Sequence, residues 1–197
     1  MTQATMSHTR RLTGIAMLSA VAGVLTYLSF PVPLMPSFIK LDLAELPALI
    51  GAFAYGPLAG AAVCLVKNLV SLMKSSSGGV GTLCNFLLGV CFVVPAGLIY
   101  KKNRTRKGAL IGSLLGAAIM AVISIFVNYY VVYPIYTAFM PMEAIIGMYQ
   151  AINPNVKTLW DCLLLFNMPF TFIKGMVSAV ITIAVYKKLT PLINGKE

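Results

Sequence analysis

A lysine and several hydrogen-bonding side chains recur on one face of a long apolar segment near the end of the chain. They are Asn167, Thr171, Lys174, Ser178 and Thr182, and their spacings of 4, 3, 4 and 4 residues match one side of an α-helix. A charged side chain near the centre of a bilayer costs at least ~2.5 kcal/mol, so it normally faces a bundle interior or a cavity. An amide and an ammonium there suit a neutral or weakly acidic ligand, so this stripe is the first candidate binding site.

The segments that must position these residues are membrane helices. The 197-residue chain is 59% hydrophobic and 10% charged, whereas about a quarter of the residues in a soluble domain are charged. Since ~20 apolar residues cross the hydrocarbon, we predict an all-α integral membrane protein, a bundle of six transmembrane helices. The predicted spans are about 12–30, 44–55, 58–73, 82–100, 108–133 and 158–186, and they form one substrate-binding domain over residues 1–197.

Basic residues gather at the ends of alternate spans, and this predicts the orientation. If both termini are cytoplasmic, ten of the 15 lysines and arginines fall inside the cell, within residues 10–11, 101–107 and 187–196. Positive charge favours the cytoplasmic side, so we predict N-in and C-in. The net charge of +10 is therefore explained by the orientation of the chain in the membrane. We predict contact with membrane lipid and none with nucleic acid.

Two further asparagines lie at a similar depth in other spans. At a rise of ~1.5 Å per residue, Asn85 and Asn128 lie roughly 5 and 8 Å inside the outer ends of their segments, and Asn167 roughly 13 Å. We expect these amides to converge in an outward-facing ligand pocket with Lys174 near its floor. The alternative for Asn85 and Asn128 is hydrogen bonding between helices.

Aromatic and charged residues near the outer ends have other interpretations. Tyr129, beside Asn128, is a candidate for the pocket; otherwise it belongs, with Trp160 and the tyrosines at 130, 133 and 136, to an aromatic belt at the outer interface. Lys67 is interpreted as reaching the interface along its own apolar stem. Lys157 and Asp161, four residues apart, are interpreted as a surface pair.

The loop over residues 31–42 follows the first span and is rich in proline, which favours an extended path. With the other outer loops, over residues 74–81 and 134–157, it is placed to cover a pocket that opens outward. The alternative is a plain connector with interfacial anchors.

Motifs for catalysis are missing. The sequence has no Walker A pattern, no His-Glu-x-x-His and no serine nucleophile motif. Four of its five acids, Asp42, Glu45, Glu143 and Asp161, fall outside or at the outer interface on this topology. We therefore predict no catalytic residue, no metal and no cofactor, and we expect the driving energy to come from a partner. The four cysteines are interpreted as small buried hydrophobes.

Several stretches together resemble a known family. They are six spans, a first helix with Ala16-x-x-x-Ala20, the loop PSFIKLDLAELP at 36–47, the stretch GPLAGAAVCLVKN at 56–68, and PFTFIKG at 169–175. In this order and spacing they resemble the riboflavin-binding S component of energy-coupling factor (ECF) transporters, over nearly the whole chain.

The resemblance implies a subunit of a prokaryotic cell membrane that captures riboflavin from outside. Its implied partners are a transmembrane coupling subunit, which Ala16 and Ala20 would contact, and two cytoplasmic ATPase subunits that use the ATP. The implied ligand contacts are Phe38, Leu41 and Asp42 in the first loop and Asn85, Asn128, Asn167 and Lys174 below it. The family often has asparagine where this chain has Thr171, which can donate one hydrogen bond and accept another.

Other functions stay open at this point. One is an S component for thiamine, folate or pantothenate, because the architecture does not distinguish these vitamins. Another is an autonomous secondary carrier in which Lys174 is a coupling charge. A small membrane enzyme is disfavoured, because the sequence lacks clustered acids and nucleophiles.

Overall fold

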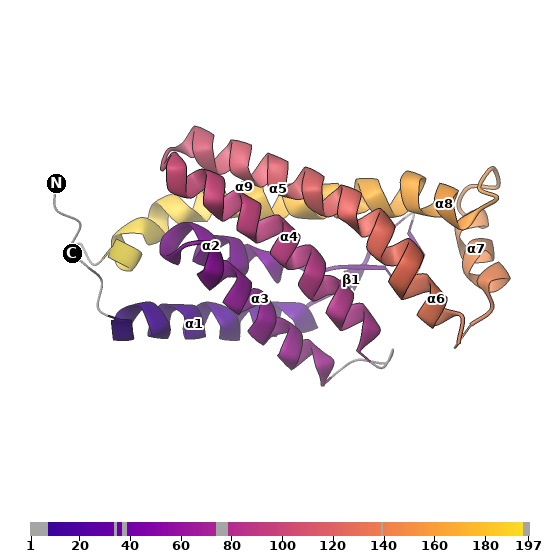
Figure 1. The fold of residues 1–197 in the computed structure, drawn as a ribbon, viewed down its shortest axis with the longest axis horizontal. Coiled ribbons are helices and arrows are strands. Elements are labelled where there is room, and N and C mark those ends of the chain that lie inside the picture. Colours follow the sequence, from indigo (N-terminus) through magenta and orange to yellow (C-terminus); the bar gives the residue numbers. More distant parts are fainter. Residues whose placement is uncertain (1–7, 34, 37–38, 74–78, 139, 195–197) are drawn as a thin grey trace.

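Helices that run back and forth along one axis make up this computed structural model (Figure 1). The structure describes residues 8–33, 35–36, 39–73, 79–138 and 140–194, and for residues 186–194 the backbone alone. The bundle is formed by α1 (His8–Tyr27), α2 (Glu45–Tyr55), α3 (Pro57–Leu72), α4 (Val80–Lys102), α5 (Arg106–Val127) and α9 (Met168–Asn194). The start of α1 and the end of α9 lie at the same end of the molecule (Figure 1).

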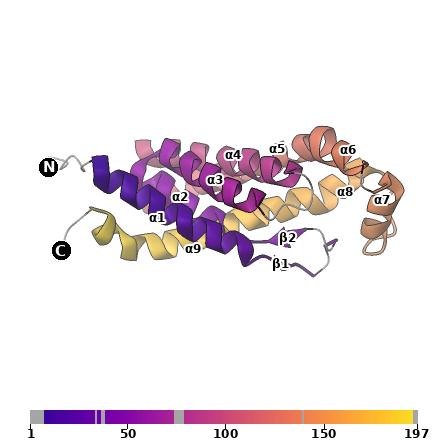
Figure 2. The ribbon, with the colours of Figure 1, turned by 90° about the horizontal axis from the view of Figure 1, so that it is seen from below.

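Shorter elements complete the opposite end. They are the strands β1 (Phe30–Pro31) and β2 (Lys40–Leu41), the helices α6 (Tyr133–Tyr136), α7 (Met142–Gln150) and α8 (Leu159–Cys162), and the π-helical segments η1 (Asn128–Val132) and η2 (Leu163–Asn167). The strands pair antiparallel, so part of the proline-rich loop is a small hairpin. Figure 2 shows this hairpin beyond the end of α1 and beside α9.

The helical class predicted from the sequence is confirmed. In the described part of the chain, three continuous stretches are long and apolar enough to cross a membrane: Val80–Lys102, Arg106–Tyr136 and Leu159–Val185. The helices α2 and α3 are apolar but shorter, and α1 begins at His8 instead of residue 12. Six crossings and the N-in, C-in orientation stay predictions.

The turn between α2 and α3 is set by two adjacent residues. Gly56 has a φ of 99°, which favours glycine, and Pro57 begins α3. A methyl group at Gly60 would lie 2.7 Å from the Cβ atom of Ala52, so only glycine lets α2 and α3 approach this closely. Ala52 and Gly60, each four residues from Gly56, therefore face each other.

The two π-helical segments are each followed by a proline. The segment η1 ends two residues before Pro134, and η2 ends two residues before Pro169. A proline inside a helix lacks an N–H and crowds the carbonyl group of residue i−4, and a wider turn relieves that crowding. Such turns occur frequently at functional sites, and here they contain Asn128 and Asn167.

Two groups of buried side chains form the core. The larger lies among α1, α2, α3, α4, α5 and α9 and includes Leu49, Val63 and Phe92. The smaller lies at the far end, around Tyr149 and Leu163. Three of the four cysteines are buried and all four are free, as predicted for small hydrophobic residues.

Candidate ligand-binding site

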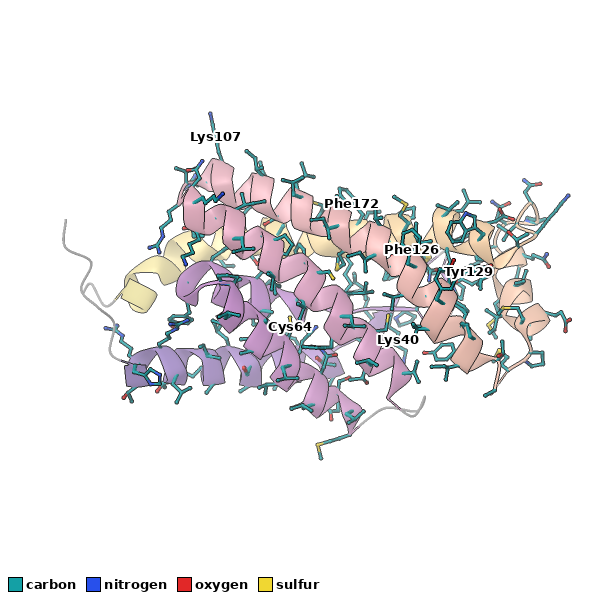
Figure 3. The ribbon with its side chains drawn as sticks, in the orientation of Figure 1. Lys40, Cys64, Lys107, Phe126, Tyr129 and Phe172 are labelled. Atoms are coloured by element: carbon teal, nitrogen blue, oxygen red, sulfur yellow. The ribbon has the colours of Figure 1, made fainter. Side chains whose placement is uncertain are left out.

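A cavity of about 530 Å³ lies between the helices, within the ~300–1,000 Å³ typical of small-molecule sites. Its wall brings together six residues that the sequence analysis selected: Asp42, Asn85, Asn128, Asn167, Thr171 and Lys174. They come from the segment after β2 and from α4, η1, η2 and α9. Lys40 also lines the cavity, and in Figure 3 it lies on the α6 side of the molecule, away from the start of α1.

Three other selected residues are placed differently. The ring of Tyr129 packs edge-on against Trp160, with 5.2 Å between ring centroids, and Tyr129 is not among the residues that line the cavity. The structure thus favours the aromatic belt for Tyr129. Leu41 is half-buried in β2, opposite Phe30, and does not line the cavity either. Phe38 lies outside the described residues.

Two lysines and two carboxylates form a network at the cavity. Lys174 Nζ lies 3.1 Å from Asp42 Oδ2 and 3.5 Å from Glu45 Oε2. Lys67 Nζ lies 2.7 Å from Glu45 Oε1, and both of these side chains are buried. Asp42, Glu45 and Lys174 line the cavity. The positive and negative charges balance, so each buried charge has a partner.

Two interpretations from the sequence are wrong here. Lys67 does not reach the interface, because its ammonium is buried against Glu45. Glu45 is not an outer-interface acid, because it is only 3% exposed inside the bundle. Glu45 and Lys67 stand eleven residues before and eleven residues after Gly56, so the tight hairpin brings them together. This symmetry was present in the sequence and would have revealed the pair.

Asp42 keeps its negative charge in this network. Burial by itself would raise the pKa of Asp42, but the attraction of Lys174 and Lys67, with hydrogen bonds from the Ala44 N–H and Lys174, outweighs burial and lowers the pKa to about 2. The carboxylate therefore remains ionised at any pH in which the protein is expected to work.

The lowered pKa of Asp42 predicts how its contribution to stability depends on pH. The pKa of Asp42 falls from 3.8 in the unfolded chain to about 2 in the folded protein. The ionised carboxylate therefore adds stability at pH values above 3.8, and this stability is lost as the pH falls through about 2. We expect the difference in melting temperature between the wild type and Asp42→Asn to stay constant from pH 8 to 5. Thermal unfolding in detergent measures it. A difference that fades between pH 6 and 5 would contradict this assignment.

Asn167 is held by two buried tyrosines. The Tyr149 hydroxyl donates to Asn167 Oδ1 at 2.8 Å, Asn167 Nδ2 donates to the Tyr133 hydroxyl at 3.4 Å, and the two hydroxyls lie 2.6 Å apart. Tyr133 and Tyr149 are at most 2% exposed, so the interpretation of Tyr133 as a belt residue is wrong. Burial raises the pKa of Tyr149, which therefore stays protonated and able to donate.

The other amides leave groups for a ligand. Asn128 Nδ2 donates to the backbone carbonyl of Ser124 at 2.7 Å. This bond lies within one helix, so it is not the interhelical contact considered from the sequence. Among the residues that the structure describes, none hydrogen-bonds Asn128 Oδ1, which can therefore accept from a ligand. Asn85 is exposed to the cavity, and Thr171 is half-buried in its wall. Leu88, Met120 and Phe170 supply apolar surface.

The face of α1 that contains Ala16 and Ala20 is exposed. Both alanines are exposed, as are Met17 at 66% and Val24 at 63%. Ser19 and Gly23 are buried instead, and Gly23 faces Val70 of α3. The two small-residue faces of α1 therefore differ, since one packs inside the bundle and the other is available to a partner or to lipid.

Apolar helices around a polar, charge-balanced cavity define a helical membrane protein built to hold a small molecule between its helices. The chain belongs to the family of substrate-specific components of ECF transporters, whose sequence model matches residues 10–186. The family resemblance inferred from the sequence is thus confirmed. Members of this family are substrate-binding parts of transporters, so the chain is a transport protein and not an enzyme.

Relatives are similar over nearly the whole chain. The riboflavin transporter RibU of Staphylococcus aureus (strain TCH60) is 36% identical over 184 residues, which cover 93% of this chain and 92% of the relative. The riboflavin transporter FmnP of Bacillus subtilis (strain 168) is 34% identical over 188 residues, 94% of each chain. A solved structure, described as the S component of a bacterial ECF transporter, superimposes with a TM-score of 0.75 at 34% identity and covers 95% of this chain and 99% of its own.

Proposed function

We propose that this chain is the riboflavin-binding, substrate-specific subunit of an ECF transporter in the plasma membrane of a prokaryote. The observation that carries the proposal is the cavity of about 530 Å³, whose wall combines three asparagines with apolar side chains, in a chain similar along its length to two riboflavin transporters. A flavin has a flat aromatic ring, one polar edge of alternating acceptors and a donor, and a hydroxylated side chain. Amides match that edge, and apolar walls match the ring.

The proposed contacts follow from the wall of the cavity. Asn85, Asn128, Asn167 and Thr171 hydrogen-bond the polar edge or the hydroxyls of the ligand, and Lys174 lies at the floor with Asp42. The first loop, which contains Phe38 and Leu41, covers the ligand from outside, and Lys40 of this loop lines the cavity. Tyr129 was a further candidate, and its packing against Trp160 favours a structural role.

The proposed transporter needs partner subunits for energy. The chain crosses the membrane six times as a single domain, with both termini in the cytoplasm, and Ala16 and Ala20 contact the transmembrane coupling subunit. Two cytoplasmic ATPases supply the energy of ATP hydrolysis. The basic connection over residues 101–107 lies at the same end as the start of α1 (Figure 1), which supports a cytoplasmic location for that end.

A binding titration tests this proposal. We expect the chain, purified in detergent, to quench the fluorescence of riboflavin with a dissociation constant of about 1 μM or below, which corresponds to at least ~8 kcal/mol of binding free energy. Thiamine, folate and pantothenate at the same concentrations are expected not to compete. Millimolar binding of riboflavin by a folded protein would refute the proposal. Uptake into proteoliposomes without ATP or partners would favour a secondary carrier.

Tyr149→Phe is expected to weaken riboflavin binding without contacting the ligand. The variant removes the donor to Asn167 Oδ1, so the amide loses its fixed orientation, and one hydrogen bond of this kind corresponds to a loss of affinity of about three- to tenfold. The fluorescence titration measures this. Tyr130→Phe is the matched control, because Tyr130 is 67% exposed, and it should bind as the wild type does. Equal affinity of all three proteins would show that Asn167 needs no support from Tyr149.

A further inference from the structure

A second cavity, of about 330 Å³, lies at the end of the bundle where α2 turns into α3. Its wall includes the turn residues Gly56 and Pro57 and three basic side chains, those of Arg11, Lys101 and Arg104. They come from α1, from the end of α4 and from the connection to α5. None of these residues lines the cavity proposed for riboflavin.

The charges of this second cavity are not balanced by protein carboxylates in the described part of the chain. Asp42 and Glu45 line the other cavity, and Glu143 and Asp161 belong to α7 and α8 at the opposite end (Figure 1). Arg11 Nη2 donates to the carbonyl oxygen of Tyr55 at 3.0 Å, which fixes the guanidinium beside the turn. Three positive groups around one hollow create a potential that favours an anion.

An apolar groove continues from the same arginine. It has a volume of about 260 Å³ and runs between α1 and α3, lined by Leu12, Ile15, Leu58, Ala59 and Ala62, together with His8 and Arg11. The groove shares Arg11 and Leu58 with the cationic cavity. The small side chains of Ala59 and Ala62 leave the space that the groove occupies. A cationic hollow thus adjoins a channel of hydrocarbon surface on the outside of the bundle.

We propose that the cationic cavity and this groove together bind an anionic phospholipid. The phosphate group lies among Arg11, Lys101 and Arg104, and one acyl chain lies in the groove between α1 and α3. Basic pockets at the ends of membrane helices bind lipid headgroups in this way. A lipid fits better than an acidic segment of another protein, because the groove walls are hydrocarbon and a peptide would leave its backbone groups without partners there.

Lipid retention by the full-length chain tests the site. We expect the protein, stripped of lipid in detergent, to retain phosphatidylglycerol at least tenfold more strongly than phosphatidylcholine with the same acyl chains, as measured by native mass spectrometry. Inorganic phosphate and glycerophosphoglycerol, which lacks acyl chains, are expected to give no increase in melting temperature. Equal retention of the two lipids would overturn the proposal. So would a rise in melting temperature with inorganic phosphate that equals the rise with phosphatidylglycerol.

Matched variants locate the headgroup. The triple variant Arg11→Gln, Lys101→Gln, Arg104→Gln is expected to lose the preference for phosphatidylglycerol. The control Lys102→Gln, Arg106→Gln, Lys107→Gln removes the same charge from exposed residues that line neither hollow, and Lys107 points away from the bundle (Figure 3). The control should keep the preference within twofold. An equal loss in both variants would mean diffuse attraction and would overturn the site.

A third variant keeps all charges and fills the groove. Ala62→Phe is expected to reduce retention of phosphatidylglycerol at least fivefold, and it decides the question even if the triple variant does not fold. Unchanged retention in Ala62→Phe overturns the placement of the acyl chain. If the wild type shows no lipid preference but the triple variant fails to assemble with the coupling subunit, the cavity binds an acidic partner segment and the lipid proposal is wrong.

Discussion

Lys174→Met is expected to lower the affinity for riboflavin at least tenfold and also to destabilise the protein. The loss of one hydrogen bond from a charged group costs ~1.5–3 kcal/mol of binding free energy. Lys174 also pairs with Asp42 and Glu45. Removing one partner of a fully buried ion pair costs ~3–5 kcal/mol, because a charge remains uncompensated, and we expect a smaller cost here because Asp42 is only partly buried. Fluorescence titration and thermal unfolding measure the two effects separately.

Two comparisons separate the ligand contact from the ion network. Lys67→Met leaves Glu45 with one lysine and changes a residue that does not line the cavity, so we expect a loss of stability with affinity within about threefold of the wild type. Asp42→Asn combined with Lys174→Met removes one charge of each sign and should recover part of the stability but none of the affinity. Normal binding by the stable double variant would show that Lys174 serves only the fold.

Replacing Ala16 and Ala20 by phenylalanine is expected to abolish ATP-driven riboflavin uptake while leaving binding unchanged. Both alanines are exposed on α1, and large side chains there prevent the close approach of another helix. Neither residue lines the ligand cavity. Uptake is measured in proteoliposomes that also contain the coupling subunit and the ATPases, and binding is measured on the purified chain.

A matched pair on another helix controls for bulk alone. Ile111 and Leu115 of α5 are also four residues apart and are 50% and 46% exposed. Phenylalanine at both positions should leave uptake within about twofold of the wild type, because this face is expected to contact only lipid. Loss of binding in the alanine variant would mean that this face of α1 supports the fold, and normal uptake would mean that it is not the docking face.

The sequence was sufficient to predict that the polar residues of the cavity gather at one place. Helical spacing put Asn167, Thr171 and Lys174 on one face, and counting residues from the span ends put Asn85 and Asn128 at a similar depth. All five line the same cavity. Periodicity and depth worked because the bilayer forces each helix to run along one axis, so position along the sequence converts directly into position along that axis.

Contacts between helices could not be predicted by the same reasoning. Lys67 and Glu45 were each interpreted alone, although they are partners across a hairpin. Lys174 was selected from the sequence as a ligand contact, and the ion network gives it a second role in the fold. Tyr149 belongs to α7, outside the predicted spans, and no helical spacing of polar residues pointed to it. Its hydrogen bond to Asn167 depends on how the far end of the bundle packs.

The ion network also implies an order of events while the chain is being synthesised. Glu45 and Lys67 are 22 residues apart, whereas Asp42 and Lys174 are 132 residues apart. The hairpin of α2 and α3 can therefore leave the ribosome and enter the bilayer with its own charges already neutralised. The ion pair between Asp42 and Lys174 can form only after α9 has been synthesised. Until then we expect Asp42 to stay in the aqueous interface. The ion pair that attaches the first loop to the bundle is therefore the last of the network to form. The ligand site is complete only after α9 has been synthesised.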